Sequence, residues 1–139
     1  MDACQACLKT ELFNHTTLDI LHDNMTSSLA NHFKTDLLLF NPPYVFSSEE
    51  ELIQAQQHPN SMTALSGGKD GSAILFKFLE IIPTILSNVG VCYVVVIDYN
   101  DLSKIVNYLR SLGLNGDVIR EGRNSFEKLY ILKISFLNE

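Results

Sequence analysis

The sequence has few of the residues that mark several protein classes. Its 139 residues include only three cysteines and no tryptophan, and no apolar run reaches the roughly eighteen residues that a membrane span needs. The N-terminus lacks the basic segment and apolar block of a signal peptide. Three cysteines are too few for a disulfide framework. These absences argue against a membrane-spanning or secreted protein, and the composition is that of a soluble globular domain.

Clustered metal ligands are also missing. Cys4 and Cys7 form a CxxC pair, but no second pair follows it and the four histidines are scattered along the chain. Structural zinc needs four closely spaced ligands. The pair is instead typical of the apolar stripe of a packed helix, with Leu8 and Leu12 at helical spacing. We expect no metal site.

The sequence contains no cluster of basic residues. The formal net charge is −6; residues 1–99 carry eleven acidic against four basic side chains, and residues 100–139 carry five against six. Nucleic-acid binding needs clustered Lys and Arg that displace counterions from phosphate. A nucleic-acid substrate is therefore disfavoured.

Helix and strand patterns alternate along the chain. The spacing of apolar residues predicts helices at 2–13, 27–33, 72–86 and 98–112, and strands at 16–21, 36–40, 91–97, 118–119 and 129–136, with a hairpin connection at 121–124. The strands 36–40 and 91–97 are apolar throughout, which is typical of parallel strands buried on both faces. Residues 45–71 form a long loop, with a turn or two of helix at 48–57, and loops of this length usually serve function. This order predicts an α/β fold.

Four residues follow the predicted strand 36–40: Asn41, Pro42, Pro43 and Tyr44. In open α/β sheets, ligands bind just beyond the carboxyl ends of the strands, so this NPPY tetrad lies where a site is expected. Alternatively, the two prolines merely stop the strand and the asparagine caps the turn.

The string DLLLFNPPYV, followed by ALSGGKDG and a helix, resembles the HemK-type protein-glutamine N5-methyltransferases. These are class I S-adenosylmethionine-dependent enzymes, and the likeness is greatest to the eukaryotic branch that modifies the GGQ loop of a peptide chain release factor. It extends over essentially the whole chain. The resemblance implies a Rossmann-like sheet, mostly parallel, with an antiparallel C-terminal strand. NPPY alone is less specific, because adenine-N6 methyltransferases carry a similar tetrapeptide.

The resemblance implies roles for the tetrad. A glutamine amide nitrogen is a poor nucleophile, since its lone pair is delocalised. By resemblance, the Asn41 side-chain oxygen and the Pro42 carbonyl accept its two N–H bonds and aim the nitrogen at the sulfonium methyl of S-adenosylmethionine. Pro43 fixes the direction of the backbone and Tyr44 offers an aromatic wall to the planar amide. The contribution is positioning and electrostatics.

Three further residues belong to the expected site. By resemblance, Asp23 accepts from the amine of the cofactor adenine; alternatively, it caps a helix that begins after Asn24. Gly67 and Gly68 bring backbone close to the substrate, or simply permit a tight turn before a helix.

The chain departs from the family pattern at its start. Family members place a strand, a glycine-rich turn, a helix and a second strand before the opening helix, and none of these precedes Met1. We therefore expect residues 1–139 to be the C-terminal portion of a class I methyltransferase domain without its first two strands. The family strand order 3-2-1-4-5-7-6 would then leave strand 36–40 bare at one edge.

The resemblance also implies partners and a location. These are a release factor as protein substrate, a small zinc-binding activator subunit that adds to the sheet beside strand 16–21, and the cytoplasm, with the nucleus as a further location. Two alternatives stay open: an adenine-N6 methyltransferase acting on nucleic acid, and a non-catalytic truncated form that binds partners only.

Overall fold

The computed structural model describes residues 3–29, 32–57, 64–69, 71–123 and 127–137. The chain divides into two compact units, Met1–Ala30 and Asn31–Glu139, called here the N-terminal and C-terminal units. Helix α1 (Ala3–Asn14) of the N-terminal unit confirms the predicted opening helix, and it buries no side chain.

Two predicted elements of the N-terminal unit are wrong. Residues 16–21 form no strand, and the described part of 27–33 contains turns instead of a helix. An isolated strand has no neighbour to satisfy its backbone, so its β-branched composition is not sufficient. In the second segment, the Asp23 carboxylate accepts hydrogen bonds from Ser27 and Ser28, and this local bonding competes with helix formation.

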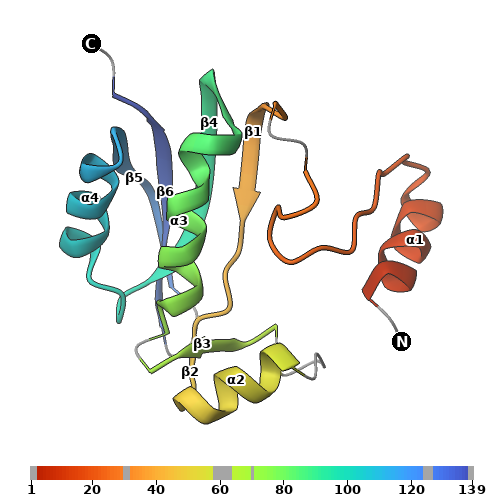
Figure 1. Ribbon diagram of the computed structural model, residues 1–139, viewed down its shortest axis with the longest axis horizontal. Coiled ribbons are helices and arrows are strands. Elements are labelled where there is room, and N and C mark those ends of the chain that lie inside the picture. Colours follow the sequence, from red (N-terminus) through yellow and green to blue (C-terminus); the bar gives the residue numbers. More distant parts are fainter. Residues whose placement is uncertain (1–2, 30–31, 58–63, 70, 124–126, 138–139) are drawn as a thin grey trace. The chain divides into compact units, whose positions relative to one another are not determined.

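The C-terminal unit is built on a sheet of four strands: β1 (Thr35–Phe40), β4 (Leu86–Ile97), β5 (Leu114–Arg123) and β6 (Lys128–Phe136). Their order is β1-β4-β6-β5 (Figure 1). β1 and β4 run parallel, whereas β6 runs antiparallel to both β4 and β5. This is the 4-5-7-6 part of the order expected from the resemblance, and β1, β4 and β5 run in one direction while the C-terminal strand β6 is antiparallel to them, as predicted.

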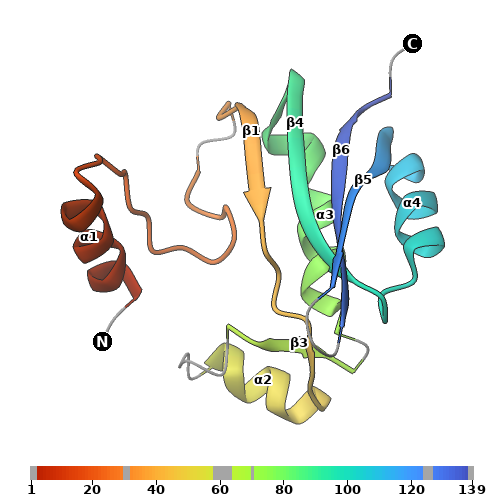
Figure 2. The same ribbon diagram turned by 180° about the vertical axis from the view of Figure 1, so that it is seen from behind.

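Two helices, α3 (Ala73–Ile85) and α4 (Leu102–Ser111), cover one face of this sheet. Phe78 of α3 stacks on Phe40 of β1 with ring centroids 3.9 Å apart. A Cβ on Gly116 of β5 would lie 2.6 Å from Leu109 of α4, and Gly116 shares its face with Leu38 across the strand pairings. In Figure 2 the strands lie in front of α3. The core therefore lies between this face and the two helices.

The opposite face of β1 is not buried. Leu37 is 56% exposed and Leu39 is 68% exposed, because the described residues of the C-terminal unit place no helix over that face. The prediction of a strand buried on both faces is wrong for β1. β1 is also an edge strand, since its only partner in the described sheet is β4.

The long loop contains structure of its own. Helix α2 (Glu49–Gln57) confirms the predicted turns of helix. Two short parallel strands, β2 (Val45–Phe46) and β3 (Ser66–Gly68), were not predicted. They are too short to leave a periodic pattern. β4 begins five residues earlier than predicted, and β5 extends on both sides of 118–119. The hairpin connection predicted at 121–124 is wrong for 121–123, which belong to β5, and residue 124 lies outside the described residues. Within the described parts of the chain, no helix is long and apolar enough to cross a membrane.

Candidate functional site

The NPPY tetrad (residues 41–44) lies directly beyond the carboxyl end of β1. The last residue of β1, Phe40, pairs with Val94, three residues before β4 ends. Asn41 is exposed, Pro42 is buried, and Pro43 and Tyr44 are half-buried. The tetrad therefore leaves the sheet at the edge where ligands of open α/β folds bind.

The two oxygens that the resemblance assigns to the target amide accept no hydrogen bond from the residues that the structure describes. Among the described residues, the Asn41 side chain has no hydrogen-bond partner, and the Pro42 carbonyl accepts no loop or turn hydrogen bond. A carbonyl oxygen has two lone pairs, so each group has its full accepting capacity for a ligand.

Glycines fix the backbone of the tetrad from the other side. A Cβ on Gly67 would lie 2.8 Å from the Pro43 carbonyl oxygen, and one on Gly71 would lie 2.5 Å from the Tyr44 carbonyl oxygen. Gly71 also has a φ of 68°, which disfavours a side chain. The two glycines are thus needed because backbone packs against the backbone of the tetrad itself.

Strands β2 and β3 hold the far end of the tetrad. The Val45 amide donates to the Leu65 carbonyl at 2.8 Å, and the Ser47 amide donates to the Gly68 carbonyl at 3.1 Å. The Gly68 amide in turn donates to the Ser47 hydroxyl at 3.0 Å. The tetrad is therefore attached at both ends, to β1 and to the β2–β3 pair. The sequence predicted that Gly67 and Gly68 approach the substrate or permit a tight turn. In the structure, Gly67 packs against the Pro43 carbonyl and Gly68 bonds to Ser47, just beyond the tetrad.

Asp23 belongs to the N-terminal unit, so it is not in the unit that contains the tetrad. Its carboxylate accepts from the Ser27 hydroxyl at 2.5 Å, from the Ser28 amide at 2.7 Å, and from the Asn24 amide at 2.7 Å. The Ser27 hydroxyl and then the Ser28 amide lower the pKa of Asp23 to about 2. Its observed role is therefore to cap its own turn, which is close to the alternative weighed from the sequence.

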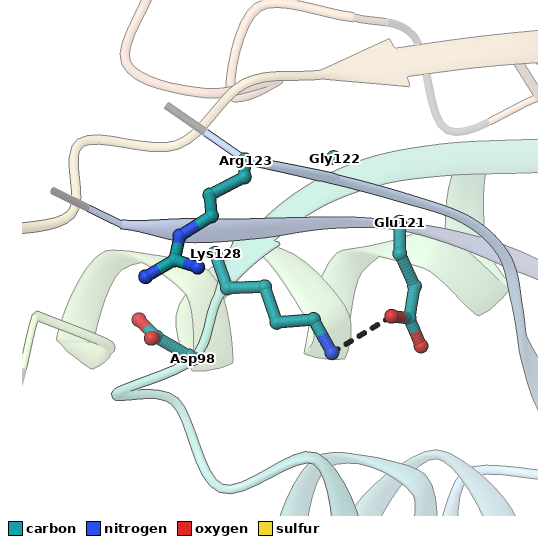
Figure 3. Close-up of a pocket in the computed structure, with 5 residues that line it drawn as sticks. All are labelled: Asp98, Glu121, Gly122, Arg123 and Lys128. Atoms are coloured by element: carbon teal, nitrogen blue, oxygen red, sulfur yellow. Dashed lines mark ion pairs between the residues drawn. The ribbon is translucent and has the colours of Figure 1, made fainter. Parts of the chain in front are cut away.

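A cavity of about 500 Å³ lies at the same edge of the sheet (Figure 3). It is lined by residues from the carboxyl ends of β4 and β5 and the start of β6: Asp98, Glu121, Gly122, Arg123 and Lys128. Lys128 and Glu121 form an ion pair of 2.7 Å, and Glu121 raises the pKa of Lys128. Sequence reasoning missed this cavity, although Asp98 ends the strongest predicted strand and so carried the same positional signal as the tetrad.

An aromatic contact links the tetrad to the region of the cavity. Phe46 of β2 and Tyr99, which follows Asp98, lie with ring centroids 5.5 Å apart at an edge-to-face angle of 72°. Both are largely exposed, at 54% and 62%. Aromatic pairs in this geometry attract one another beyond their buried area. The contact therefore fixes β2 against the end of β4.

Among the described residues of the C-terminal unit, Asn41 and Pro42 offer acceptor oxygens to an incoming amide. Asp23, in the N-terminal unit, also keeps accepting capacity. Its Oδ1 accepts from the Asn24 amide and the Ser27 and Ser28 hydroxyls, whereas its Oδ2 accepts from the Ser28 amide alone. Acceptors of this kind suit a ligand group that donates N–H bonds, such as an amide or an amine.

Comparisons with known proteins show which proteins the chain resembles. The chain is 32% identical to the human methyltransferase HEMK2 over 106 residues, covering 73% of this chain and 46% of that protein. It is 28% identical over 119 residues to the putative protein N5-glutamine methyltransferase MJ0928 of Methanocaldococcus jannaschii, covering 86% of this chain and 57% of that protein. The predicted similarity to HemK-type protein-glutamine methyltransferases is confirmed.

The fold has a solved counterpart. The structure of the E. cuniculi Mtq2–Trm112 complex, which is responsible for methylating the translation termination factor eRF1, matches with a TM-score of 0.66 at 20% identity, covering 93% of this chain and 68% of that chain. No family model matches the sequence. The chain spans about half the length of the curated relatives that it matches.

Proposed function

We propose that this chain is the part of a protein-glutamine N5-methyltransferase that receives and positions the target glutamine. The observation that carries the proposal is the pair of free acceptors, the Asn41 amide oxygen and the Pro42 carbonyl, in a tetrad held rigidly at the carboxyl end of β1. The similarity to protein N5-glutamine methyltransferases supports it.

The mechanism follows from the chemistry of an amide nitrogen. Its lone pair is delocalised into the carbonyl group, and its two N–H bonds lie in the amide plane. Asn41 and Pro42 accept one N–H each, which fixes the nitrogen and turns its lone pair out of conjugation. Such positioning is worth roughly 7–11 kcal/mol at best. S-Adenosylmethionine, when bound, supplies the electrophilic methyl group. The nitrogen loses a proton only after it has gained the methyl, so no base is needed before transfer.

The substrate and the partner are inferred from the relatives. We infer that the substrate is a peptide chain release factor and that the target is the glutamine of its GGQ loop, because the matching solved complex methylates eRF1. That complex pairs its enzyme with the small protein Trm112, and we infer an activator subunit of this kind, zinc-binding, for the present protein. A role in translation termination implies the cytoplasm, with the nucleus as a further location.

The test is methyl transfer by the full chain, mixed with an activator subunit of the Trm112 type, from radiolabelled S-adenosylmethionine to a release factor. Asn41→Ala removes one of the two acceptors. It should lower the rate by about 10²–10³-fold, the loss typical for one preorganised hydrogen-bonding group. The melting temperature should not change, because Asn41 is exposed and bonds to nothing among the described residues.

Asn88→Ala is the matched control, since Asn88 is an exposed asparagine at the other end of β4. Its rate should equal that of the wild type. Equal activity of Asn41→Ala and wild type would contradict the proposal, as would transfer to adenine in DNA or RNA in place of the glutamine. A complete lack of transfer by the wild-type mixture would favour a form that only binds partners.

A further inference from the structure

The cavity at the carboxyl ends of β4 and β5 contains two opposite charges that face one another without pairing. Lys128 is neutralised by Glu121 at 2.7 Å. In Figure 3 the Arg123 guanidinium and the Asp98 carboxylate point toward one another, yet no ion pair joins them and neither side chain has another partner among the described residues. As far as the described residues go, one strong donor and one strong acceptor are therefore left available at this cavity.

A ligand that satisfies both groups must itself offer an acceptor and a donor. A guanidinium cannot accept a hydrogen bond, and an ionised carboxylate cannot donate one. A simple anion would pair with Arg123 but would be repelled by Asp98. A simple cation would pair with Asp98 but would be repelled by Arg123. The lining has two acidic and two basic side chains, so its formal charge of zero favours neither an anionic nor a cationic ligand. A neutral peptide amide has a C=O and an N–H on adjacent atoms and fits both groups.

The position of the cavity sets how far this amide lies from the reacting nitrogen. Neighbouring strands are about 4.8 Å apart, so the ends of β6 and β5 lie roughly 10–15 Å across the sheet from the end of β1, where the tetrad begins. An extended peptide rises about 3.3 Å per residue. Three to five residues therefore bridge the distance. The exposed aromatic pair of Phe46, in β2, and Tyr99, which follows β4, lies along this edge.

We propose that this cavity binds a main-chain amide of the protein substrate, three to five residues from the methylated glutamine. Its C=O accepts from Arg123 and its N–H donates to Asp98. The inference rests on the proposed function, because it needs a peptide held at the tetrad. Binding of the main chain contributes affinity and fixes the register of the substrate peptide, and it does not depend on which side chain the peptide has at that position.

The test uses the full 139-residue chain and a fluorescent peptide with a central Gly-Gly-Gln. A series of peptides carries a single N-methylated amide at each successive position, which removes one N–H at a time. Fluorescence anisotropy should show binding about tenfold weaker for one position, three to five residues from the glutamine. In Asp98→Ala, the same N-methylation should have no further effect, because the acceptor for that N–H is gone.

Two further variants isolate the other half of the contact. Arg123→Gln should also weaken the parent peptide about tenfold, whereas Arg120→Gln, an exposed arginine on the same strand that does not line the cavity, should not. In methyl-transfer assays, the cavity variants should raise KM and leave kcat unchanged, as expected for contacts equal in ground and transition states. Circular dichroism melting curves check that each variant folds. Asp98→Ala should fold, because the main-chain hydrogen bond from the Asp98 amide to the Lys128 carbonyl does not involve the side chain.

The outcomes separate the two proposals. If the wild type methylates the peptide, and the effect of N-methylation on binding is the same in wild type and Asp98→Ala at every position, the cavity proposal is overturned and the proposed function stands. If the wild type neither binds nor methylates any peptide of the series, the proposed function fails and the cavity proposal fails with it. Dependence on the charge of one substrate side chain, with indifference to N-methylation, would also overturn main-chain recognition.

Discussion

A single carboxylate decides the structure of the turn that follows residue 23. Asp23 accepts from the Ser27 hydroxyl and from the amides of Ser28 and Asn24. Hydrogen bonds to the charged form stabilise it, which is why the pKa of Asp23 falls from its ordinary 3.8 to about 2. The same bonds replace those of the helix that the sequence predicted there.

A carboxyl titration followed by NMR checks this assignment. The pKa of Asp23 is lowered on folding, so its contribution to the turn is complete above pH 3.8 and is lost as the pH falls through about 2. Ser27→Ala should move the midpoint back toward 3.8, since the Ser27 hydroxyl is the largest cause of the shift. A wild-type midpoint near 3.8 would show that these hydrogen bonds are absent in solution.

The lack of a side chain at Gly67 determines how closely the backbone packs against the tetrad. Gly67→Ala should destabilise the fold by about 1–3 kcal/mol, the usual cost of overpacking, because the new Cβ would be 2.8 Å from the backbone of Pro43 and Gly71. The displaced tetrad should also lose methyl transfer.

Chemical denaturation and the transfer assay measure these two effects. Gly122→Ala is the control for denaturation, since a Cβ there meets nothing within 4 Å. If both variants unfold at the same denaturant concentration as the wild type, the close approach inferred at Gly67 is wrong.

Among the elements, β1 combines a buried face with an exposed one. Phe40 stacks on α3, whereas Leu37 and Leu39 are exposed and the strand has a free edge in the described sheet. The apolar run of this strand predicted its existence and its limits well. Burial on both faces could not be judged from the run, because burial depends on what lies over each face.

Leu39→Lys tests the exposed face. The change should reduce self-association of the chain, because exposed apolar edge strands promote pairing between chains and a charge opposes it. The free energy of unfolding should stay within about 0.5 kcal/mol of the wild type.

Leu38→Lys is the matched control on the same strand. Leu38 is half-buried on the face covered by α3 and α4, so this variant should lose about 1–3 kcal/mol. Light scattering and urea denaturation give the two readouts. Equal stability losses for Leu38→Lys and Leu39→Lys would mean that the two faces do not differ in burial.

For the whole molecule, the cysteines report on the stability of each unit. Cys92 lies in the core of the C-terminal unit, where burial raises the pKa of its thiol from 9.0 to about 12. Cys7 is exposed on α1. A thiol reagent should modify Cys7 at once and Cys92 at least about 10³-fold more slowly, through unfolding.

The same burial predicts a dependence on pH. Above pH 9 the unfolded thiol ionises and the folded one does not, so the free energy of unfolding should fall as the pH rises from 9 toward 12. Cys92→Ala should remove this component. Labelling of Cys92 as fast as that of Cys7 would contradict the buried core.

The parts of the fold that the sequence predicted are those with long, regular patterns. The amphipathic helix at 72–86 was predicted with boundaries close to those of α3, and the apolar run at 91–97 predicted the existence and the end of β4 but not its start. The tetrad was located by its place after a strand. The charged cavity was not, because Asp98 is distant in sequence from the other lining residues, which lie within 121–128, and the two segments meet only through the pairing of β4 with β6.

The hydrogen bond from Val45 to Leu65 joins the two ends of the segment between them, so the position of the tetrad does not depend on the length of that segment. Once the two ends are joined, lengthening the intervening segment twofold costs only about 0.6 kcal/mol of closure entropy. Insertions after Ser48 are consequently cheap and leave the tetrad where β1, Ser47 and the glycines hold it. A longer segment at this place therefore offers a route to a new substrate preference that leaves the reacting groups unchanged.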